Sequence, residues 1–175
     1  MPRFAKELLT DKNQITGRFD SQVVGPALDK ANDSFTYDPS MDSIAGAFTT
    51  CFNNYLCNDL AWTGDVPYRI ISDAIYYWNF DASNKYLNVS ENLCSVMTKN
   101  PHLQVFVASG YFDLATPFFG TEYTFDHLGL DPSLQDHVTI QNYKGGHMMY
   151  LELDTLKQLK QDLTSFYQKT VPNTP

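Results

Sequence analysis

Asp113 and His147 are the residues whose types and positions most clearly suggest catalytic chemistry in this chain of 175 residues. Asp113 follows the apolar run 103–109, and His147 follows the run 138–143 and the glycine turn Gly145-Gly146. A carboxylate can orient a histidine ring and stabilise its charged form, while the histidine accepts and returns a proton. Because a helical crossover brings the ends of two parallel strands to the same edge of a sheet, we expect the two side chains to meet.

The nucleophile that would complete such a triad is missing from the sequence. In the α/β-hydrolase fold the chain order is nucleophile, acid, histidine, and the serine lies in a Gly-x-Ser-x-Gly turn. No such pentapeptide occurs in the chain. Neither Ser109 nor Ser133 lies on a strand–turn–helix between glycines, so we nominate neither. The sequence therefore predicts the acid and the base of a triad without its serine.

Each of the two residues also has a purely structural explanation. An Asp after a strand often caps a helix or forms an Asx turn, and a His in a glycine turn can simply be solvated. Thr116 precedes Pro117, which is favoured at the first position of a helix, so we expect Thr116 to cap that helix. That would leave Asp113 free to point toward the edge of the sheet. The pair favours a function more strongly than either residue alone.

The other residues with chemical potential give weaker signals. His102, His127 and His137 lack the spacing of metal ligands, and we expect them to be structural or solvated. Met148 and Met149 are expected to fill the core or to form the wall of a pocket beside the catalytic histidine. We expect no metal and no cofactor.

The three cysteines are an odd set. Cys51 and Cys57 lie on one predicted helix but on different faces, and Cys94 lies far from both in the sequence. We expect three buried free thiols, although a single disulfide stays possible. The spacing matches neither a disulfide framework nor a zinc site.

The composition is that of a globular protein. Hydrophobic residues make up 43% of the chain and charged residues 18%, which excludes a disordered polar chain. The net charge of −8 argues against a nucleic-acid partner, because phosphate binding needs a basic surface. No apolar run approaches the roughly 18 residues that would span a bilayer, so we expect no membrane partner. Residues 1–7 do not resemble a signal peptide.

The chain divides near residue 100. Residues 101–175 have the rhythm of a parallel α/β unit, and we expect strands at 103–109 and 138–143 and helices at 116–128 and 154–169. Residues 1–100 are expected to form a helical and loop-rich region, with helices at 4–9, 42–60 and 91–99 and mostly loop and turn at 17–40.

One segment extends from Asn100-Pro101-His102-Leu103 through Ser109-Gly110-Tyr111-Phe112-Asp113-Leu114-Ala115-Thr116-Pro117-Phe118-Phe119, and a second is Gly146-His147-Met148-Met149-Tyr150. Both segments resemble the serine carboxypeptidase family, in its bacterial branch. Upstream segments are similar to the insertion that covers the active site in that branch: Gly17-Arg18-Phe19-Asp20, Gly25-Pro26, Tyr37-Asp38-Pro39-Ser40 and Tyr86-Leu87-Asn88-Val89. The resemblance covers nearly all of the chain from about residue 15 onward.

This resemblance implies an α/β-hydrolase that removes single residues from peptide C-termini through an acyl-enzyme. Asp113 would be the triad acid, His147 the triad base, and Met148 a residue beside the substrate pocket. The expected fold class is α/β: the last two parallel strands of an α/β-hydrolase with their helices, preceded by a mainly helical cap. The family's serine and oxyanion hole belong to an N-terminal half that has no counterpart in these residues, so we expect the chain alone to be inactive.

Two classes of function follow from these expectations. The chain is either part of a serine carboxypeptidase, whose partners would be the missing N-terminal half and a peptide substrate, or a non-catalytic remnant that self-associates or binds another protein. In both cases the strand 103–109 would carry an unpaired edge that can recruit another strand. The compartment stays open, because complete members of the family are often exported.

Overall fold

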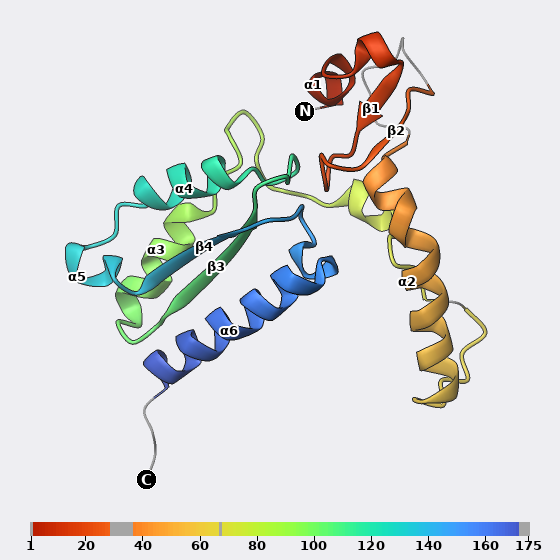
Figure 1. Cartoon of the computed structure of the whole chain (residues 1–175). Coiled ribbons are helices and arrows are strands. Elements are labelled where there is room, and N and C mark those ends of the chain that lie inside the picture. Colours follow the sequence, from red (N-terminus) through yellow and green to blue (C-terminus); the bar gives the residue numbers. More distant parts are fainter. Residues whose placement is uncertain (1, 29–36, 67, 172–175) are drawn as a thin grey trace.

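The computed structural model describes residues 2–28, 37–66 and 68–171, and within these ranges the chain is a mixed α/β protein (Figure 1). Its two sheets are a parallel pair of strands, β3 and β4, and a small antiparallel hairpin, β1 and β2. Helices in both regions surround or extend from these strands. None of the described helices is long and apolar enough to cross a membrane.

The parallel pair confirms the two strands expected in the second region. Strand β3 spans Val105–Gly110 and β4 spans Val138–Tyr143, and their register aligns Gly110 with Tyr143. Helices α4 (Phe118–Asp126) and α5 (Pro132–Gln135) form the crossover, and α6 (Leu153–Thr170) follows β4. Helix α4 lies on one face of the sheet and α6 on the other (Figure 1).

A small number of specific contacts hold α6 against the parallel sheet. Tyr143 at the end of β4 is fully buried, and its hydroxyl donates a hydrogen bond of 2.9 Å to Oδ2 of Asp162 in α6. Burial and the neighbouring carboxylate both raise the pKa of Tyr143, so its hydroxyl keeps its proton. The rings of Phe106 and Phe166 approach to 5.4 Å between centroids. These contacts fasten α6 to the sheet and fix where the chain leaves β4.

The first region contains a hairpin that was not expected. Helix α1 (Pro2–Glu7) leads into β1 (Gln14–Thr16), which pairs with β2 (Val24–Pro26). The prediction of mostly loop for residues 17–40 is therefore wrong at β2. Strands of three residues are too short to show an alternating pattern. A Cβ added to Gly25 in β2 would lie 2.5 Å from the hydroxyl oxygen of Tyr37 and 2.8 Å from Cβ of Pro39, so a larger residue there would displace a neighbouring side chain.

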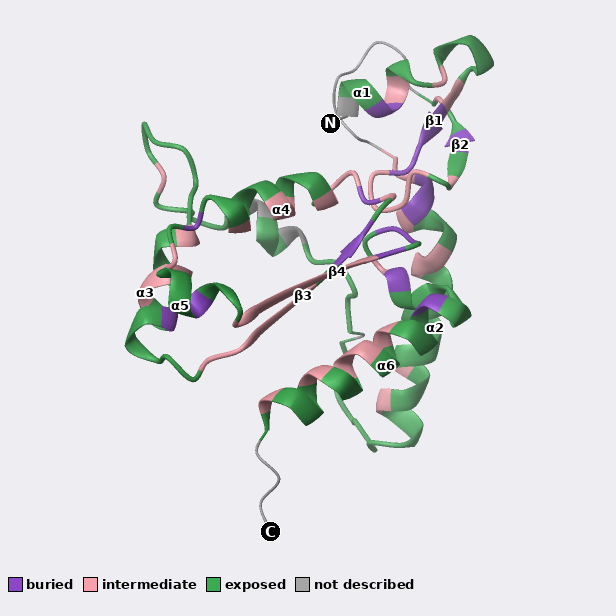
Figure 2. Cartoon of the chain, turned by 60° about the vertical axis from the view of Figure 1, so that its left-hand side comes forward, coloured by how far each residue is buried: buried purple, intermediate pink, exposed green. Residues whose placement is uncertain are grey.

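Helix α2 (Pro39–Asn58) begins earlier than expected and is less covered than expected. The carboxylate of Asp38 accepts hydrogen bonds from the backbone N–H groups of Ser40 and Met41, and Pro39 occupies the first turn. Beyond its first turn the helix extends away from the hairpin (Figure 1), and exposed positions predominate along it (Figure 2). Figure 2 also shows buried positions gathering where β3 and β4 end, near the start of α2.

The expectation for the cysteines is half confirmed. All three thiols are free, but Cys51 and Cys57 are exposed and Cys94 is half-buried. The prediction of burial was wrong for the pair on α2, where most residues from 45 onward are exposed. Helix α3 (Ser90–Lys99) lies between the two regions in the sequence and buries Met97 completely.

The start of α4 corrects a further expectation. The helix begins at Phe118, and the residue at its N-cap is Pro117, which has no side-chain oxygen to offer. Thr116 therefore does not cap the helix; its hydroxyl is bonded elsewhere. The helix ends at Asp126, before Gly129, whose φ of +70° is a left-handed conformation that glycine adopts without strain.

Candidate functional site

The structure brings Asp113 and His147 into direct contact. Nδ1 of His147 lies 2.7 Å from Oδ2 of Asp113. Asp113 lies three residues beyond the end of β3 and His147 four residues beyond the end of β4, and the parallel register places both turns at the same edge. The expected approach of the two side chains is confirmed, and the atom that faces the carboxylate is Nδ1.

The carboxylate of Asp113 has further hydrogen bonds within its own turn. Oδ1 accepts from the backbone N–H of Ala115 at 2.7 Å and of Thr116 at 2.9 Å, and Oδ2 accepts from the Thr116 hydroxyl at 2.6 Å. The expectation that Thr116 would release Asp113 from a structural role is therefore wrong. Asp113 forms an Asx turn mainly with Oδ1 and holds the histidine with Oδ2, so both roles coexist in one side chain.

These bonds determine the charge of the acid. Burial by itself raises the pKa of Asp113, since its side chain is only 3% exposed. The hydrogen bonds from Thr116, His147 and Ala115 outweigh that effect, and the pKa of Asp113 is lowered from the usual 3.8. The carboxylate is thus ionised at neutral pH and can only accept hydrogen bonds. Nδ1 of His147 must then carry the proton that points at Asp113.

The opposite side of the histidine ring is open. The side chain of His147 is 43% exposed, and Nε2 has no hydrogen-bond partner in the part of the chain that the structure describes. The Thr116 hydroxyl oxygen lies 3.3 Å from Nδ1, and the ring of Phe19 lies 5.3 Å from the imidazole between centroids. In the neutral ring that carries its proton on Nδ1, Nε2 has a lone pair that can accept a second proton.

Glycines let the two turns approach each other closely. The backbone N–H of Phe112 donates to the carbonyl of Gly145 at 2.9 Å. A Cβ on Gly110 would overlap the carbonyl oxygen of Gly146, and a Cβ on Gly146 would overlap the carbonyl oxygen of Phe19. The sequence signal that singled out these turns therefore has a direct cause in the backbone packing.

Sequence reasoning missed the segment that packs on both turns. Residues 18–21, between β1 and β2, donate to or accept from backbone groups beside Asp113 and at His147. No periodicity marks such a segment, since its contacts are backbone hydrogen bonds over a long sequence separation. The motif Gly17-Arg18-Phe19-Asp20 was the only signal, and it drew attention only through the resemblance.

Met148 and Met149 divide the two roles expected of them. Met149 is buried in the core. Met148 is part of the wall of a small crevice of about 150 Å³, together with Phe19, Asp20, Ile44, Leu151 and Glu152. The crevice lies beside His147, because Gly146 and Met148 on either side of that residue both line it.

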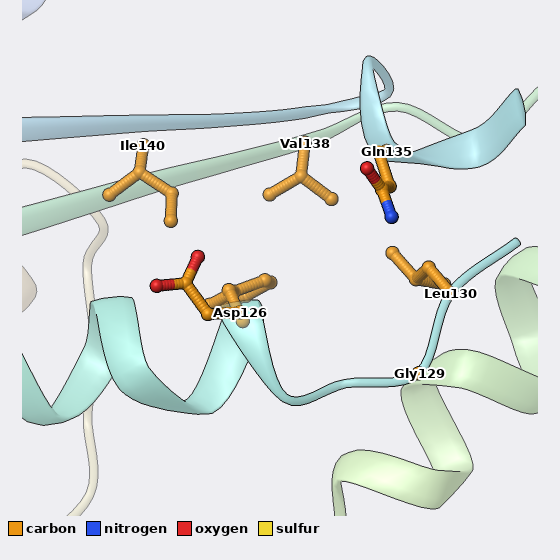
Figure 3. Close-up of a pocket in the computed structure, with 7 residues that line it drawn as sticks. Asp126, Gly129, Leu130, Gln135, Val138 and Ile140 are labelled. Carbon is orange, nitrogen blue, oxygen red and sulfur yellow. The ribbon is translucent and has the colours of Figure 1, made fainter. Parts of the chain in front are cut away.

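A second pocket lies at the other end of the sheet. It has a volume of about 300 Å³ and is lined by Phe125, Asp126, Gly129, Leu130, Gln135, Val138 and Ile140. Figure 3 shows Val138 and Ile140 of β4 pointing toward Leu130 and Asp126 across this space. Val138 begins β4, whereas Asp113 follows the last residue of β3 and His147 follows the last residue of β4. The larger pocket therefore does not belong to the site.

The remaining histidines lie apart from the site. His102 is exposed, and Nδ1 of His127 lies 2.7 Å from the carbonyl oxygen of Tyr123 in the preceding turn. His137 is half-buried, and its Nδ1 is buried without a hydrogen-bond partner. Within residues 2–28, 37–66 and 68–171 no group of three His, Cys, Asp or Glu side chains could hold a metal ion.

No protein-family model matches the chain, and comparisons with curated proteins and with solved structures found no match either. The features that bear on function are therefore the geometry of the Asp113–His147 pair and the sequence motifs around it.

Proposed function

We propose that Asp113 and His147 are the acid and the base of a serine-type hydrolase site, and that the hydrolase is a serine carboxypeptidase. The observation that carries the proposal is the bond of 2.7 Å between Nδ1 and a buried, ionised carboxylate, which leaves Nε2 free at the strand edge. This is the geometry that a general base needs.

The chemistry follows from that arrangement. Nε2 of His147 would accept the proton of a serine hydroxyl while the serine oxygen attacks a peptide carbonyl, and Asp113 would stabilise the charged ring. The ring would then give the proton to the amino group of the departing residue. Attack by a water molecule, activated in the same way, would release the acyl group and restore the serine.

The fold supports the same proposal. The pair β3 and β4 has α4 on one face and α6 on the other (Figure 1), and in this proposal it would form the last two strands of an α/β-hydrolase with their helices. The class of substrate rests on the resemblance of segments 100–119 and 146–150 to serine carboxypeptidases. Met148 would then lie beside the substrate, in the wall of the crevice next to His147.

The serine is the part that these residues do not supply. The sequence has no Gly-x-Ser-x-Gly turn, so in this proposal the nucleophile comes from polypeptide outside the 175 residues. The chain alone is then inactive, because loss of a triad member lowers the rate by several orders of magnitude.

A serine-directed fluorophosphonate tests the proposal. The chain alone should take up no label, and co-expression with the polypeptide encoded immediately upstream should produce a labelled serine in that polypeptide. His147→Ala should abolish the labelling, whereas His127→Ala, at an exposed histidine far from the site, should leave it intact. Labelling of the chain alone, or labelling that survives His147→Ala, would overturn the proposal.

A second candidate function is supported by the open edge of the parallel sheet. Within the described residues β3 pairs with β4 alone, and its other edge presents backbone groups in a strand rich in Val and Phe. A non-catalytic module could use this edge to self-associate or to bind another protein. Light scattering over a wide concentration range measures this directly, and a strictly monomeric mass would count against self-association.

A further inference from the structure

We infer that residues 17–21 form a clamp that holds the Asp113–His147 pair, and that Asp38 and Ser40 act through it as positioning residues. The catalytic meaning of this inference rests on the proposed function, but its geometry does not. The clamp belongs to the hairpin region, whereas the pair belongs to the parallel unit, so two distant parts of the sequence build one site.

The clamp contacts both turns through the backbone. The N–H of Leu114 donates to the carbonyl of Arg18 at 3.0 Å, and the N–H of Ser21 donates to the carbonyl of Phe112 at 2.9 Å. These two bonds hold the residues immediately before and after Asp113. The N–H of His147 itself donates to the carbonyl of Phe19 at 2.6 Å. One short segment therefore sets the positions of the acid and the base at the same time.

The clamp also contacts the imidazole ring. The ring of Phe19 packs against that of His147 with an interplanar angle of 56°. The guanidinium carbon of Arg18 lies 4.5 Å from the centroid of the Phe19 ring, which restricts the movement of that ring in turn. Because the aromatic contact limits rotation of the imidazole, it favours the orientation in which Nδ1 faces Asp113.

The clamp is anchored at the start of α2. The hydroxyl of Ser40 accepts a hydrogen bond from the N–H of Phe19 at 3.1 Å and donates one to Oδ1 of Asp38 at 2.5 Å. The carboxylate of Asp38 accepts from the N–H of Arg18 at 3.2 and 3.3 Å. Phe19 is thus held by Ser40 through its N–H group and holds His147 through its carbonyl group. Ser40 is buried, with 4% of its surface exposed.

The same three residues occur elsewhere in the chain without this connection. Asp131-Pro132-Ser133 begins α5 as Asp38-Pro39-Ser40 begins α2, and in both places the serine N–H and hydroxyl bond to the aspartate. In the described residues neither the Asp131 carboxylate nor the Ser133 hydroxyl bonds beyond its own turn. The local motif alone therefore does not explain the bonds to Arg18 and Phe19, and Ser133 offers a matched control.

Nuclear magnetic resonance of the ¹⁵N-labelled full chain tests the clamp, because the Nδ1 proton of His147 exchanges slowly with water only while the carboxylate holds it. Ser40→Ala should accelerate this exchange by about tenfold, the effect expected from losing one buried hydrogen bond. Ser133→Ala removes the same hydroxyl from the same motif and should leave the exchange rate unchanged. Assignment of the resonance comes from its loss in His147→Gln.

If Ser40→Ala does not fold, the same exchange is measured in Asp38→Asn, since Asn retains the cap of α2 but weakens the bonds to Arg18. Exchange of the His147 Nδ1 proton in Asp38→Asn should be faster than in the unaltered chain, by a smaller factor than in Ser40→Ala. Unchanged exchange in a folded Ser40→Ala chain, or in Asp38→Asn, would overturn the inference. So would the absence of the resonance from the unaltered chain. The measurement needs neither serine nor substrate, so a failure of phosphonate labelling alone would refute the proposed function and leave the clamp standing.

Discussion

At the C-terminal ends of β3 and β4 the chain buries polar groups and pairs them, whereas between residues 48 and 89 it exposes large apolar side chains. We call residues 110–113 and 145–147 the strand-end region, and residues 48–66 and 68–89 the aromatic region. Asp113 is buried with four hydrogen bonds, while Tyr77 and Tyr86 are almost wholly exposed. Both regions depart from the usual distribution, in which charged side chains lie outside and large apolar side chains inside.

The two regions differ in how far their structure depends on contacts within the chain. The strand-end region is determined by backbone hydrogen bonds and close glycine contacts within these residues. In the aromatic region the backbone hydrogen bonds join residues close in sequence, and its exposed Trp62, Trp78 and Phe80 are typical of surfaces that another polypeptide covers. This contrast agrees with the proposal that a further polypeptide completes the site.

The largest effect should come from filling the gap between the two turns. Gly110→Val would place a side chain against the backbone carbonyls of Gly145 and Gly146, which cannot move aside without disturbing both turns. We expect a loss of about 3 kcal/mol in the free energy of unfolding, measured with urea. Gly120→Ala is the control, since nothing lies within 4 Å of its added Cβ, and the variant should gain roughly 0.5–1 kcal/mol. Similar effects of the two changes would contradict the close packing described for the strand-end region.

Removal of the acid should have the next largest effect. Asp113→Ala leaves the donors of Ala115, Thr116 and His147 without their acceptor, and we expect a loss of about 2–3 kcal/mol by urea unfolding. Asp131→Ala removes an exposed aspartate that forms the same kind of turn, and it should lower the stability less. An equal loss in both variants would mean that the buried bonds of Asp113 stabilise the chain no more than the exposed bonds of Asp131.

The charge of the same residue predicts a dependence on pH. Because the pKa of Asp113 is lowered in the folded chain, its ionisation stabilises the fold above the unfolded pKa, and this stabilisation is lost as the pH falls through the folded value. Between neutral pH and pH values below 3.8, the unaltered chain should lose stability more steeply than Asp113→Asn. Parallel curves of unfolding free energy against pH for the two chains would show that the carboxylate is not stabilised as described.

The smallest effect should come from the aromatic region. Tyr86 is 98% exposed, so Tyr86→Ser should change the free energy of unfolding by less than about 0.5 kcal/mol. Thermal unfolding of the isolated chain measures this. A loss comparable to that of Asp113→Ala would mean that the aromatic region is packed in solution, and the comparison between the two regions would fail.

The sequence predicted the strand-end region better than the rest because its signals are local. The apolar run 138–143 coincides with β4, and one crossover is enough to bring Asp113 and His147 to the same edge. Thr116 was misassigned because its hydroxyl can either cap a helix or bond to an aspartate, and the spacing does not decide between them. Whether Cys51 and Cys57 are buried or exposed depends on which segments pack on α2, and no pattern in the helix itself reveals that.

The hairpin and the clamp were beyond sequence reasoning for a different reason. Strands β1 and β2 have three residues each, too few for a pattern, and β2 contains both Gly25 and Pro26, which usually indicate a turn. The bonds of Arg18 and Phe19 to Asp38 and Ser40 join positions about twenty residues apart. Only the folded chain shows that this loop packs on both turns of the site.

The most direct test of the central claim is the release of C-terminal residues from a blocked dipeptide by the chain co-expressed with the polypeptide encoded immediately upstream. We expect turnover that falls by about a thousandfold or more in His147→Ala and in Asp113→Asn, and that is unchanged in His127→Ala and in Asp131→Asn. Turnover that survives the loss of His147, or that the isolated chain shows by itself, would contradict the assignment of Asp113 and His147 as the acid and base of a serine-type site.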